Sequence, residues 1–277
     1  MFFSEMETAT IIDLRLGDCV EGMRALATES IDVVVTSPHY NLGIRYAHYR
    51  DDVARPLYLE WCMGWAKELR RILKPDGSFF LNIGASPGNP LLPHQLALRF
   101  SSLFVLQNTI HWVKSITVEV GNPPSPLSVG HFKPINSSRY LNDCHEYLFH
   151  FTPYGRTPLK RRAIGVPYSD KSNIQRWRHT SGEDCRCRGN TWYVPYSTIH
   201  SRAKERPHPA TFPPQLVVMA LRLHGVTEES IVLDPFMGLG NSGIAAKECG
   251  VRHFIGFEID PCYFAEAQYR LQKTSPF

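Results

Sequence analysis

Hydrophobic and polar positions along the chain follow two periods in turn, and this predicts strands that alternate with helices. Short runs rich in β-branched and aromatic residues have the length of buried strands. Longer segments repeat their apolar residues at helical spacing and begin or end near proline or glycine. We expect strands at residues 11–16, 31–36, 78–83, 104–113, 231–234 and 253–259. We expect helices at residues 20–28, 56–73, 91–100, 213–224, 242–249 and 261–272.

The regular pattern stops after Lys114 and returns near residue 208. The stretch between, residues 115–207, is rich in Pro, Gly, Asn and Ser, and one strand is expected in it, at residues 146–151. It is too long for an ordinary loop of a compact domain, so we interpret it as a functional insertion with irregular structure of its own. Strands alternating with helices on both sides of it predict an α/β fold with one doubly wound, mostly parallel sheet. The predicted parts of the chain are residues 1–114, 115–207 and 208–277.

Length and composition are those of a single enzyme-sized domain with an insertion. The 277 residues are 43% hydrophobic and 20% charged, which suffices to bury one substantial core. The first ten residues lack the basic start and apolar run of a secretory signal, and no stretch approaches the roughly 18 consecutive apolar residues of a membrane span. We therefore expect a soluble, cytoplasmic protein with no membrane partner.

The seven cysteines are scattered and odd in number, unlike the framework of a secreted disulfide-rich protein. We expect reduced thiols. Cys185 and Cys187 stand close together, but no second pair of cysteines or histidines lies nearby at ligand spacing and arginines flank them. The sequence therefore predicts no metal site.

Positive charge is concentrated in one segment. Residues 156–206 hold twelve Lys and Arg against four acidic residues, although the net charge of the whole chain is only +4. Aromatic side chains are interleaved with these cations at Tyr168, Trp177, Trp192, Tyr193 and Tyr196. A solvated basic loop would have the same charge, but cations mixed with aromatic rings are typical of surfaces that contact phosphates and stack on bases. The segment predicts a nucleic-acid partner.

A glycine-rich turn predicts a nucleoside cofactor. The segment Gly238-Leu239-Gly240-Asn241-Ser242-Gly243 matches G-x-G-x-x-G directly after an expected strand and at the start of an expected helix. Glycines let the backbone approach a ligand, and Glu258, twenty residues past Gly238 at the end of the next strand, can accept both ribose hydroxyls. NAD and S-adenosylmethionine both present such a ribose, so the turn alone leaves a nicotinamide-dependent oxidoreductase open.

Two further features bear on the cofactor. Asp234-Pro235-Phe236 places a carboxylate and an aromatic ring at the start of the turn, which suits a cationic, phosphate-free ligand better than a pyrophosphate. Asp18 ends the first expected strand, at the same edge of the sheet. It can hydrogen-bond an adenine or cap the following helix, and both interpretations remain open.

A second turn follows the expected strand at residues 31–36 and carries Ser37-Pro38-His39-Tyr40. Proline has no N–H and a fixed φ, so the turn is rigid and poor in donors, with the Ser37 hydroxyl and nearby carbonyls free to accept. The amino group of an aromatic base is a poor nucleophile because its lone pair is delocalised. Acceptors for its hydrogens favour the geometry of attack, and Tyr40 would stack on an extracted base.

At these residues the chain resembles the DNA amino-methyltransferases of the circularly permuted β class. Residues 36–40 resemble their S-P-P-Y catalytic motif, and residues 234–240 resemble their D-P-F-x-G-x-G cofactor motif. Residues 208–213 are similar to their H-P-A-x-F-P segment, residues 110–114 to an I-x-W-x-K strand, and residues 190–192 to the tract before H-P. The order is that of the β class: catalytic motif, target-recognition insertion, cofactor motif.

The resemblance implies methylation of cytosine N4 in double-stranded DNA, with S-adenosylmethionine as donor and no covalent intermediate. It implies a seven-stranded Rossmann-like sheet and a DNA-associated role in a prokaryotic cytoplasm. It suggests homodimers and leaves open a cognate restriction endonuclease. The catalytic positions are Ser37, Pro38, His39 and Tyr40. The cofactor positions are Asp18, His208, Pro209, Thr211, Phe212, Asp234, Pro235, Phe236, Gly238, Gly240, Asn241, Ser242 and Glu258.

The chain departs from the family pattern at His39, where a second proline is usual, and this puts loop stiffness and base choice in question. We do not expect His39 to act as a base, because the methylated amine can lose its proton to water. Ser37 resembles the cytosine-N4 enzymes and aspartate there the adenine-N6 enzymes, so adenine stays an alternative. Cytosine-C5 methylation is disfavoured, since it needs a thiolate on the catalytic loop and the Pro261-Cys262 pair is expected to start a helix.

Overall fold

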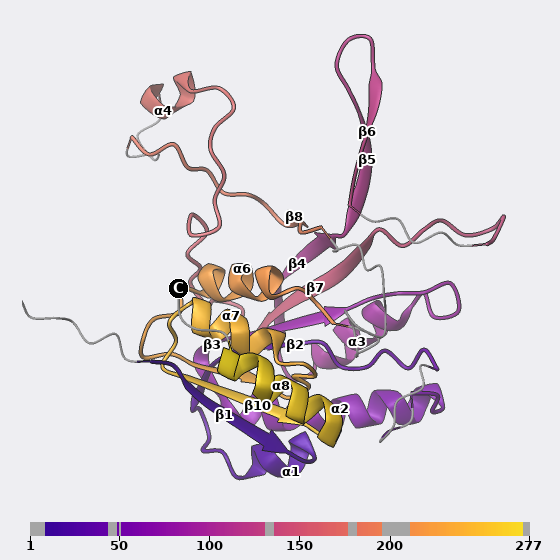
Figure 1. Ribbon diagram of the computed structural model, residues 1–277, viewed down its shortest axis with the longest axis vertical. Helices are drawn as coiled ribbons and strands as arrows, with labels where there is room; N and C mark the ends of the chain where they lie inside the picture. The colour runs from indigo at the N-terminus through magenta and orange to yellow at the C-terminus, as the bar shows by residue number, and fades with distance from the viewer. Residues whose placement is uncertain are drawn as a thin grey trace, which may run out of the picture.

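A large mixed sheet with helices on both faces forms the body of the protein (Figure 1). The computed structural model describes residues 9–43, 49, 51–130, 136–176, 182–195 and 211–273. The sheet strands are β1 (Ile11–Leu16), β2 (Ile31–Thr36), β3 (Leu73–Ile83), β4 (Val105–Val113), β7 (His145–Thr152), β8 (Thr191–Tyr193), β9 (Ile231–Asp234) and β10 (His253–Glu258). The helices are α1 (Cys19–Arg24), α2 (Arg55–Ile72), α3 (Leu92–Phe100), α4 (Ser172–Arg176), α6 (Pro214–His224), α7 (Asn241–Glu248) and α8 (Pro261–Lys273).

The strand order is β1-β10-β9-β2-β3-β7-β4-β8. Neighbours from β1 to β3 are parallel, β7 runs antiparallel to both β3 and β4, and β8 is parallel to β4. The predicted α/β fold with a mostly parallel, doubly wound sheet is confirmed. The sheet has eight strands where seven were expected. The added strand, β8, is only three residues long, too short to give a hydrophobic period.

Two apolar layers cover the two faces of the sheet. On one face α1, α2 and α3 pack their buried side chains against the strands, with Trp65 of α2 fully buried among aromatic rings. On the other face lie α6, α7 and α8, and α6 buries most of its length. Burial of such faces is the main favourable term in folding, which explains why the helical periods in the sequence predicted these elements.

Element ends differ slightly from the prediction. The helix expected at residues 20–28 ends at Arg24, and the others differ by one or two residues. The segment Lys74-Pro75-Asp76-Gly77 ends α2 as expected, but it lies inside β3 as a bulge, because the register jumps from Ile31↔Leu73 to Val33↔Ser78. Lys74 Nζ then reaches Asp32 Oδ1 at 2.7 Å across the two strands.

The described residues within 115–207, which are residues 115–130, 136–176 and 182–195, are more regular than the composition predicts. They begin with a two-stranded hairpin, β5 (Ser115–Val120) and β6 (Ser125–Gly130), that projects from the sheet in Figure 1. A second projection carries α4. Both β7 and β8 belong to the main sheet. The expected strand at 146–151 is therefore a central sheet strand, whereas the boundaries of the insertion at 115 and 207 stay a prediction.

The sheet reverses its winding between β9 and β2, which are neighbours. The chain leaves β9 through α7 toward β10, and leaves β2 through α2 toward β3 in the other direction. A crevice opens outside the carboxyl ends of strands at such a switch point. The turns after β2 and β9 therefore lie side by side, although 198 residues separate Thr36 from Asp234. Within the described residues, no helix is long and apolar enough to cross a bilayer.

Candidate active site

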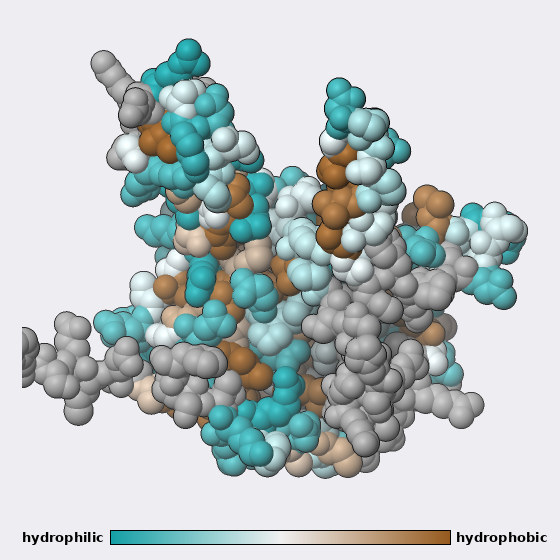
Figure 2. All heavy atoms as spheres, turned by 45° about the horizontal axis from the view of Figure 1, so that its top comes forward, coloured by the Kyte–Doolittle hydropathy of each residue, from teal (hydrophilic) through white to brown (hydrophobic). Residues whose placement is uncertain are grey.

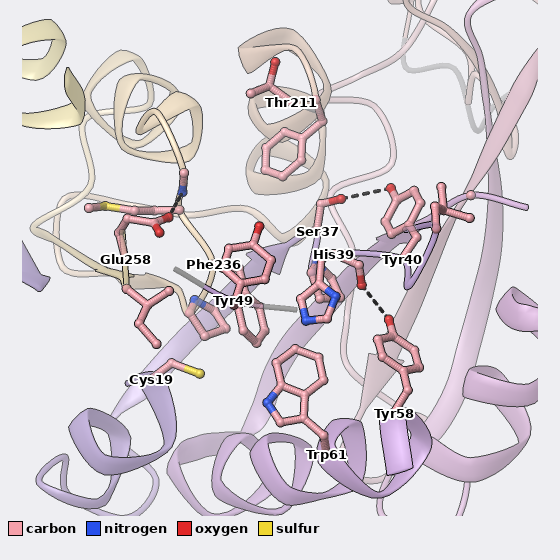
Figure 3. A pocket seen from close by; sticks show the side chains of 18 of the residues that line it. Cys19, Ser37, His39, Tyr40, Tyr49, Tyr58, Trp61, Thr211, Phe236 and Glu258 are labelled. Atoms are coloured by element: carbon pink, nitrogen blue, oxygen red, sulfur yellow. Dashed lines mark hydrogen bonds between the residues drawn. The ribbon is translucent and has the colours of Figure 1, made fainter. Parts of the chain in front are cut away.

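A cavity of about 670 Å³ lies at the carboxyl ends of the central strands, within the size range of small-molecule sites (Figure 3). The turn after β2 forms one wall, and the turn after β9 and the end of β10 form another. The predicted site residues that line it are Ser37, Pro38, His39, Tyr40, Asp18, Thr211, Phe212, Pro235, Phe236, Gly238, Asn241 and Glu258. The structure thus brings together both predicted motifs.

Asp234, Gly240 and Ser242 do not line the cavity and lie behind it. The Asp234 carboxylate is fully buried and accepts hydrogen bonds from the Thr36 hydroxyl (2.6 Å), the Ser242 hydroxyl (2.6 Å) and the Phe236 N–H (3.0 Å). Burial raises the pKa of Asp234 to about 6. This carboxylate joins the Ser37–Tyr40 turn to the glycine turn, and it shapes the site without lining the cavity.

The glycine turn has the conformation that its residues permit. Gly238 and Gly240 have φ of +51° and +77°, a region that favours glycine. A Cβ at Gly240 would come within 3.0 Å of Leu271 and 3.3 Å of Ala267, so this glycine lets α8 pack close to the turn. Gly238, in contrast, faces the cavity. His208 and Pro209 lie outside the described residues.

Glu258 ends β10 with its carboxylate at the cavity. Its Oε2 accepts the Gly238 N–H at 3.0 Å, a bond that Figure 3 draws as a dashed line. Its Oε1 accepts the Asp260 N–H at 2.8 Å. Burial raises the pKa of Glu258. Each carboxylate oxygen has two lone pairs, so both can still accept from a ligand. The half-exposed Ile259 side chain lies beside it and adds an apolar surface for a flat ring.

Aromatic side chains form the floor between the two turns. The Trp61 ring, from α2, lies 5.4 Å from the Phe236 ring and 4.6 Å from the His39 ring. Tyr49 and Tyr58 also contact His39. Ring faces carry negative charge density, so this floor favours a cationic group above it.

The turn at residues 37–40 holds a chain of polar contacts. Ser37 Oγ lies 2.9 Å from Tyr40 Oη. Tyr40 Oη in turn donates toward Glu146 Oε2 at 2.9 Å and Asn82 Oδ1 at 3.2 Å. Lys114 Nζ lies 3.0 Å from the other Glu146 oxygen. A serine hydroxyl at the cavity wall is therefore linked to a charged pair.

His39 does not point freely into the cavity. Its Nδ1 lies 2.7 Å from Asp51 Oδ1, and its carbonyl accepts the Tyr58 hydroxyl at 2.6 Å. The same Asp51 carboxylate accepts the backbone N–H groups of Asn41 and Leu42 at 2.8 and 3.0 Å. The turn is thus fixed by the ring of His39 and by Asp51, in place of the second proline that the family pattern has.

Asp18 caps α1: its carboxylate accepts the Val20 and Glu21 N–H groups at 2.8 and 3.0 Å, while it also lines the cavity. Next to it, Cys19 lines the cavity as well, but burial raises the pKa of its thiol well above the normal range. A protonated thiol is a poor nucleophile. Cys262 is exposed at the start of α8, as expected.

The site residues that were not predicted include Asp51, Trp61, Lys114 and Glu146. Lys114 was noted only within a motif, and Trp61 only as part of a helical period. Glu146 had one signal, a carboxylate at the start of an apolar strand. Because β7 is antiparallel, its amino end lies at the edge where the parallel strands end, and the sequence does not specify that direction. Among the described residues, no group of three or more His, Cys, Asp or Glu is placed to hold a metal ion.

Comparisons with known proteins agree with this geometry. The family model N6_N4_Mtase, described as DNA methylase, matches residues 31–269. The chain is 28% identical over 269 residues to the type II methyltransferase M.HpaI of Haemophilus parainfluenzae, covering 94% of this chain and 74% of that protein. It is 27% identical over 272 residues to the type II methyltransferase M.BglII of Bacillus subtilis, covering 94% and 68%.

Two solved structures have a similar fold. The PvuII DNA methyltransferase (cytosine-N4-specific) superposes with a TM-score of 0.68 at 20% identity, covering 97% of this chain and 89% of that one. TTHA0409 of Thermus thermophilus, complexed with S-adenosyl-L-methionine, superposes with a TM-score of 0.62 at 22% identity, covering 95% and 94%.

Proposed function

The chain belongs to the N6/N4 family of DNA methylases, and we propose that it transfers a methyl group from S-adenosylmethionine to N4 of a cytosine flipped out of double-stranded DNA. One observation carries the proposal: Ser37 of the first turn and Phe236 of the second line a single cavity. Acceptors for a base amine and a surface for a nucleoside cofactor therefore lie within one site. Family membership argues against the oxidoreductase alternative that the glycine turn left open.

The residues present fit S-adenosylmethionine. Glu258 offers carboxylate oxygens to a ribose, and the Trp61–Phe236 floor suits the positive charge of a sulfonium. A positively charged sulfur makes its methyl group electrophilic, and this is the chemistry that the cofactor supplies. The turn after β9 also lacks a cluster of Lys or Arg for phosphates, which suits a phosphate-free cofactor.

The base amine would be held at the opposite wall. Ser37 Oγ accepts one amino hydrogen, which favours the pyramidal nitrogen that attacks the methyl group. The ring of Tyr40 offers a face on which the flipped base stacks. His39, paired with Asp51, holds the turn in place and takes no proton. The methylated amine then loses its extra proton to water.

Cytosine N4 is preferred over adenine N6 because the acceptor is a serine, as in the N4 enzymes that the motif resembles. The similarity in fold to a cytosine-N4-specific methyltransferase supports the same choice. Attack at cytosine C5 is disfavoured, since the cavity cysteine, Cys19, has a raised pKa and stays protonated at neutral pH.

DNA would be bound by the two projections, the β5–β6 hairpin and the segment that carries α4 (Figure 1). Figure 2 shows hydrophilic residues gathered on the projection that carries α4 and an apolar stripe along the hairpin. The stripe consists of the exposed residues Ile116, Val118, Val120 and Leu127. The projection that carries α4 belongs to the basic segment at residues 156–206, which can neutralise phosphates. Homodimer formation and a cognate restriction endonuclease stay predictions from the resemblance.

The experiment is to express the protein in cells that lack DNA methyltransferases and to sequence their DNA with a method sensitive to modified bases. We expect 4-methylcytosine in one sequence context, reduced at least about 100-fold by Ser37→Ala, since loss of one group that stabilises the transition state costs about this much. The matched control is Ser102→Ala, an exposed serine after α3.

Two outcomes would contradict the proposal. A signal on adenine in the same assay would replace the base choice and leave the methylase assignment intact. A folded wild-type protein that binds S-adenosylmethionine and leaves the DNA unmodified would reject the proposed function.

A further inference from the structure

Three oxygen atoms surround the Tyr40 hydroxyl at the wall of the cavity. They are Ser37 Oγ at 2.9 Å, Glu146 Oε2 at 2.9 Å and Asn82 Oδ1 at 3.2 Å. Tyr40 has a single proton to donate. Which of the three oxygens receives it decides where the Ser37 proton points, and whether both lone pairs of Ser37 Oγ are left for the base.

Two of these oxygens can only accept. An ionised carboxylate has no proton, so Glu146 cannot donate to Tyr40. Asn82 is oriented by its own Nδ2, which donates to the Tyr147 carbonyl at 3.2 Å and leaves Oδ1 toward Tyr40. Both groups therefore draw the Tyr40 proton away from Ser37. The remaining contact can form only if Ser37 donates its hydroxyl proton to Tyr40.

The surroundings hold Glu146 in this role. Lys114 Nζ lies 3.0 Å from Glu146 Oε1, and the two side chains are 19% and 16% exposed, so the pair is largely shielded from solvent. Gly84 lies next to both Tyr40 and Glu146. A Cβ at this position would come within 3.0 Å of the Tyr40 ring and 3.2 Å of Glu146 Cγ, so a glycine lets the two side chains pack closely here. This close packing leaves Tyr40 and Glu146 little freedom to separate.

We propose that Glu146 is a positioning residue that fixes the proton direction along Ser37–Tyr40, so that the Ser37 proton points to Tyr40 and both lone pairs of the Ser37 oxygen can accept from the amino group of the target base. The inference rests on the proposed function. A carboxylate at position 37 would accept in any surroundings, whereas a hydroxyl can donate or accept. A serine-based site therefore needs a neighbour that commits its proton elsewhere, and Glu146 meets this need through Tyr40.

The test is Glu146→Gln, which keeps the size of the side chain. Lys114 can only donate, so it would hold the oxygen of the introduced amide and turn the amide N–H groups toward Tyr40. Tyr40 Oη would then accept from the amide, and its own proton would have two acceptors left, Ser37 Oγ at 2.9 Å and Asn82 Oδ1 at 3.2 Å, of which the shorter contact favours Ser37. We expect kcat to fall about 10- to 100-fold, with KM for DNA and for S-adenosylmethionine changed less than about 3-fold, because the lost acceptor acts mainly in the transition state.

A double-mutant cycle separates this role from a merely structural one. In a Tyr40→Phe background there is no hydroxyl to direct, so Glu146→Gln should change kcat by less than about 2-fold, measured in single turnovers with enzyme in excess. The control Glu60→Gln removes an exposed carboxylate from α2 and should leave kcat unchanged. Thermal unfolding of each variant verifies that it is folded.

The outcomes distinguish the two proposals. Wild-type enzyme that methylates cytosine while Glu146→Gln keeps the wild-type kcat would overturn this inference and leave the proposed function in place. An equal loss of kcat with and without the Tyr40 hydroxyl would also overturn it, since Glu146 would then act through packing or charge. Wild-type enzyme without methylation activity on DNA would reject the proposed function itself.

Discussion

Asp234 shows at the residue scale how one buried group organises both halves of the site. Its carboxylate receives hydrogen bonds from β2, from α7 and from its own turn, and burial raises its pKa to about 6. The folded state therefore binds the Asp234 proton more tightly than the unfolded chain, whose pKa is near 3.8. The residue's contribution to stability is full below about pH 3.8 and is lost as pH rises through about 6.

This predicts a pH-dependent stability difference between the wild type and Asp234→Asn. The two pKa values, about 6 and 3.8, correspond to about 3 kcal/mol. Relative to the variant, the wild type should lose about 2 to 3 kcal/mol of unfolding free energy between about pH 4 and about pH 8. Urea denaturation of both proteins across this range measures it. A difference that stays constant with pH would mean that Asp234 is not the group that titrates.

His39 holds its turn in place through side-chain and backbone partners. A proline limits backbone freedom by its ring, whereas His39 achieves a fixed turn through Asp51 and the Tyr58 hydroxyl. The departure from the family motif is thus compensated by partners elsewhere in the chain.

At the scale of elements, a buried polar chain joins three strands and a helix on the side of the sheet away from the site. Ser78 Oγ of β3 lies 2.9 Å from His150 Nε2 of β7 and 2.9 Å from His224 Nδ1 of α6. Asn108 Nδ2 of β4 donates to His150 Nδ1 at 3.0 Å. Both histidines are neutral here, because burial lowers the pKa of His150 to about 3 and also lowers that of His224.

Removal of the shared hydroxyl should loosen the packing of α6 on the sheet. Ser78→Ala leaves a buried polar atom on each histidine without this partner, and each such loss costs about 1 to 3 kcal/mol. We expect the unfolding free energy to fall by on the order of 3 kcal/mol, measured by urea denaturation at neutral pH. The exposed Ser102→Ala should change it by less than about 0.5 kcal/mol. Equal effects of the two substitutions would contradict a linking role for Ser78.

At the scale of the whole molecule, the topology of the sheet positions the cavity, and the distribution of charge indicates the surface that contacts DNA. Strand order places the cavity at the carboxyl edge of the sheet, and the described part of the basic segment includes the projection that carries α4 (Figure 1). Two of its acids, Glu183 and Asp184, are paired with Arg162 and Lys171. Because Lys and Arg outnumber the acidic residues in this segment, it keeps a net positive charge, which favours contact with the phosphates of DNA.

The salt dependence of DNA binding tests whether the basic segment contacts phosphates. Arg161→Gln combined with Arg186→Gln removes two exposed cations from the basic segment. If both contact phosphates, the slope of log K against log salt becomes shallower by about 2, since each contact contributes about 0.9. Fluorescence anisotropy with a labelled duplex at several salt concentrations measures it. Arg24→Gln with Arg252→Gln, toward the opposite edge of the sheet, should leave the slope unchanged, and equal effects of the two pairs would refute the assignment.

The sequence by itself determined the features that depend on neighbouring residues in the chain. Helical and strand periods, the Ser37–Tyr40 turn and the glycine turn at residues 234–240 are local patterns, so they could be predicted from the chain alone. The alternation of elements also implied that both turns lie at one edge of a parallel sheet, and the structure places them there.

Only the tertiary structure decided which distant side chains complete the site. The antiparallel direction of β7 puts Glu146 at the cavity, β4 brings Lys114 to it, and Asp51 folds back onto His39. It also decided that Asp234 and Ser242 lie behind the cavity, because which face of a turn is buried depends on what packs against it. Strand direction and pairing come from long-range packing free energy, and no local pattern of residues records them.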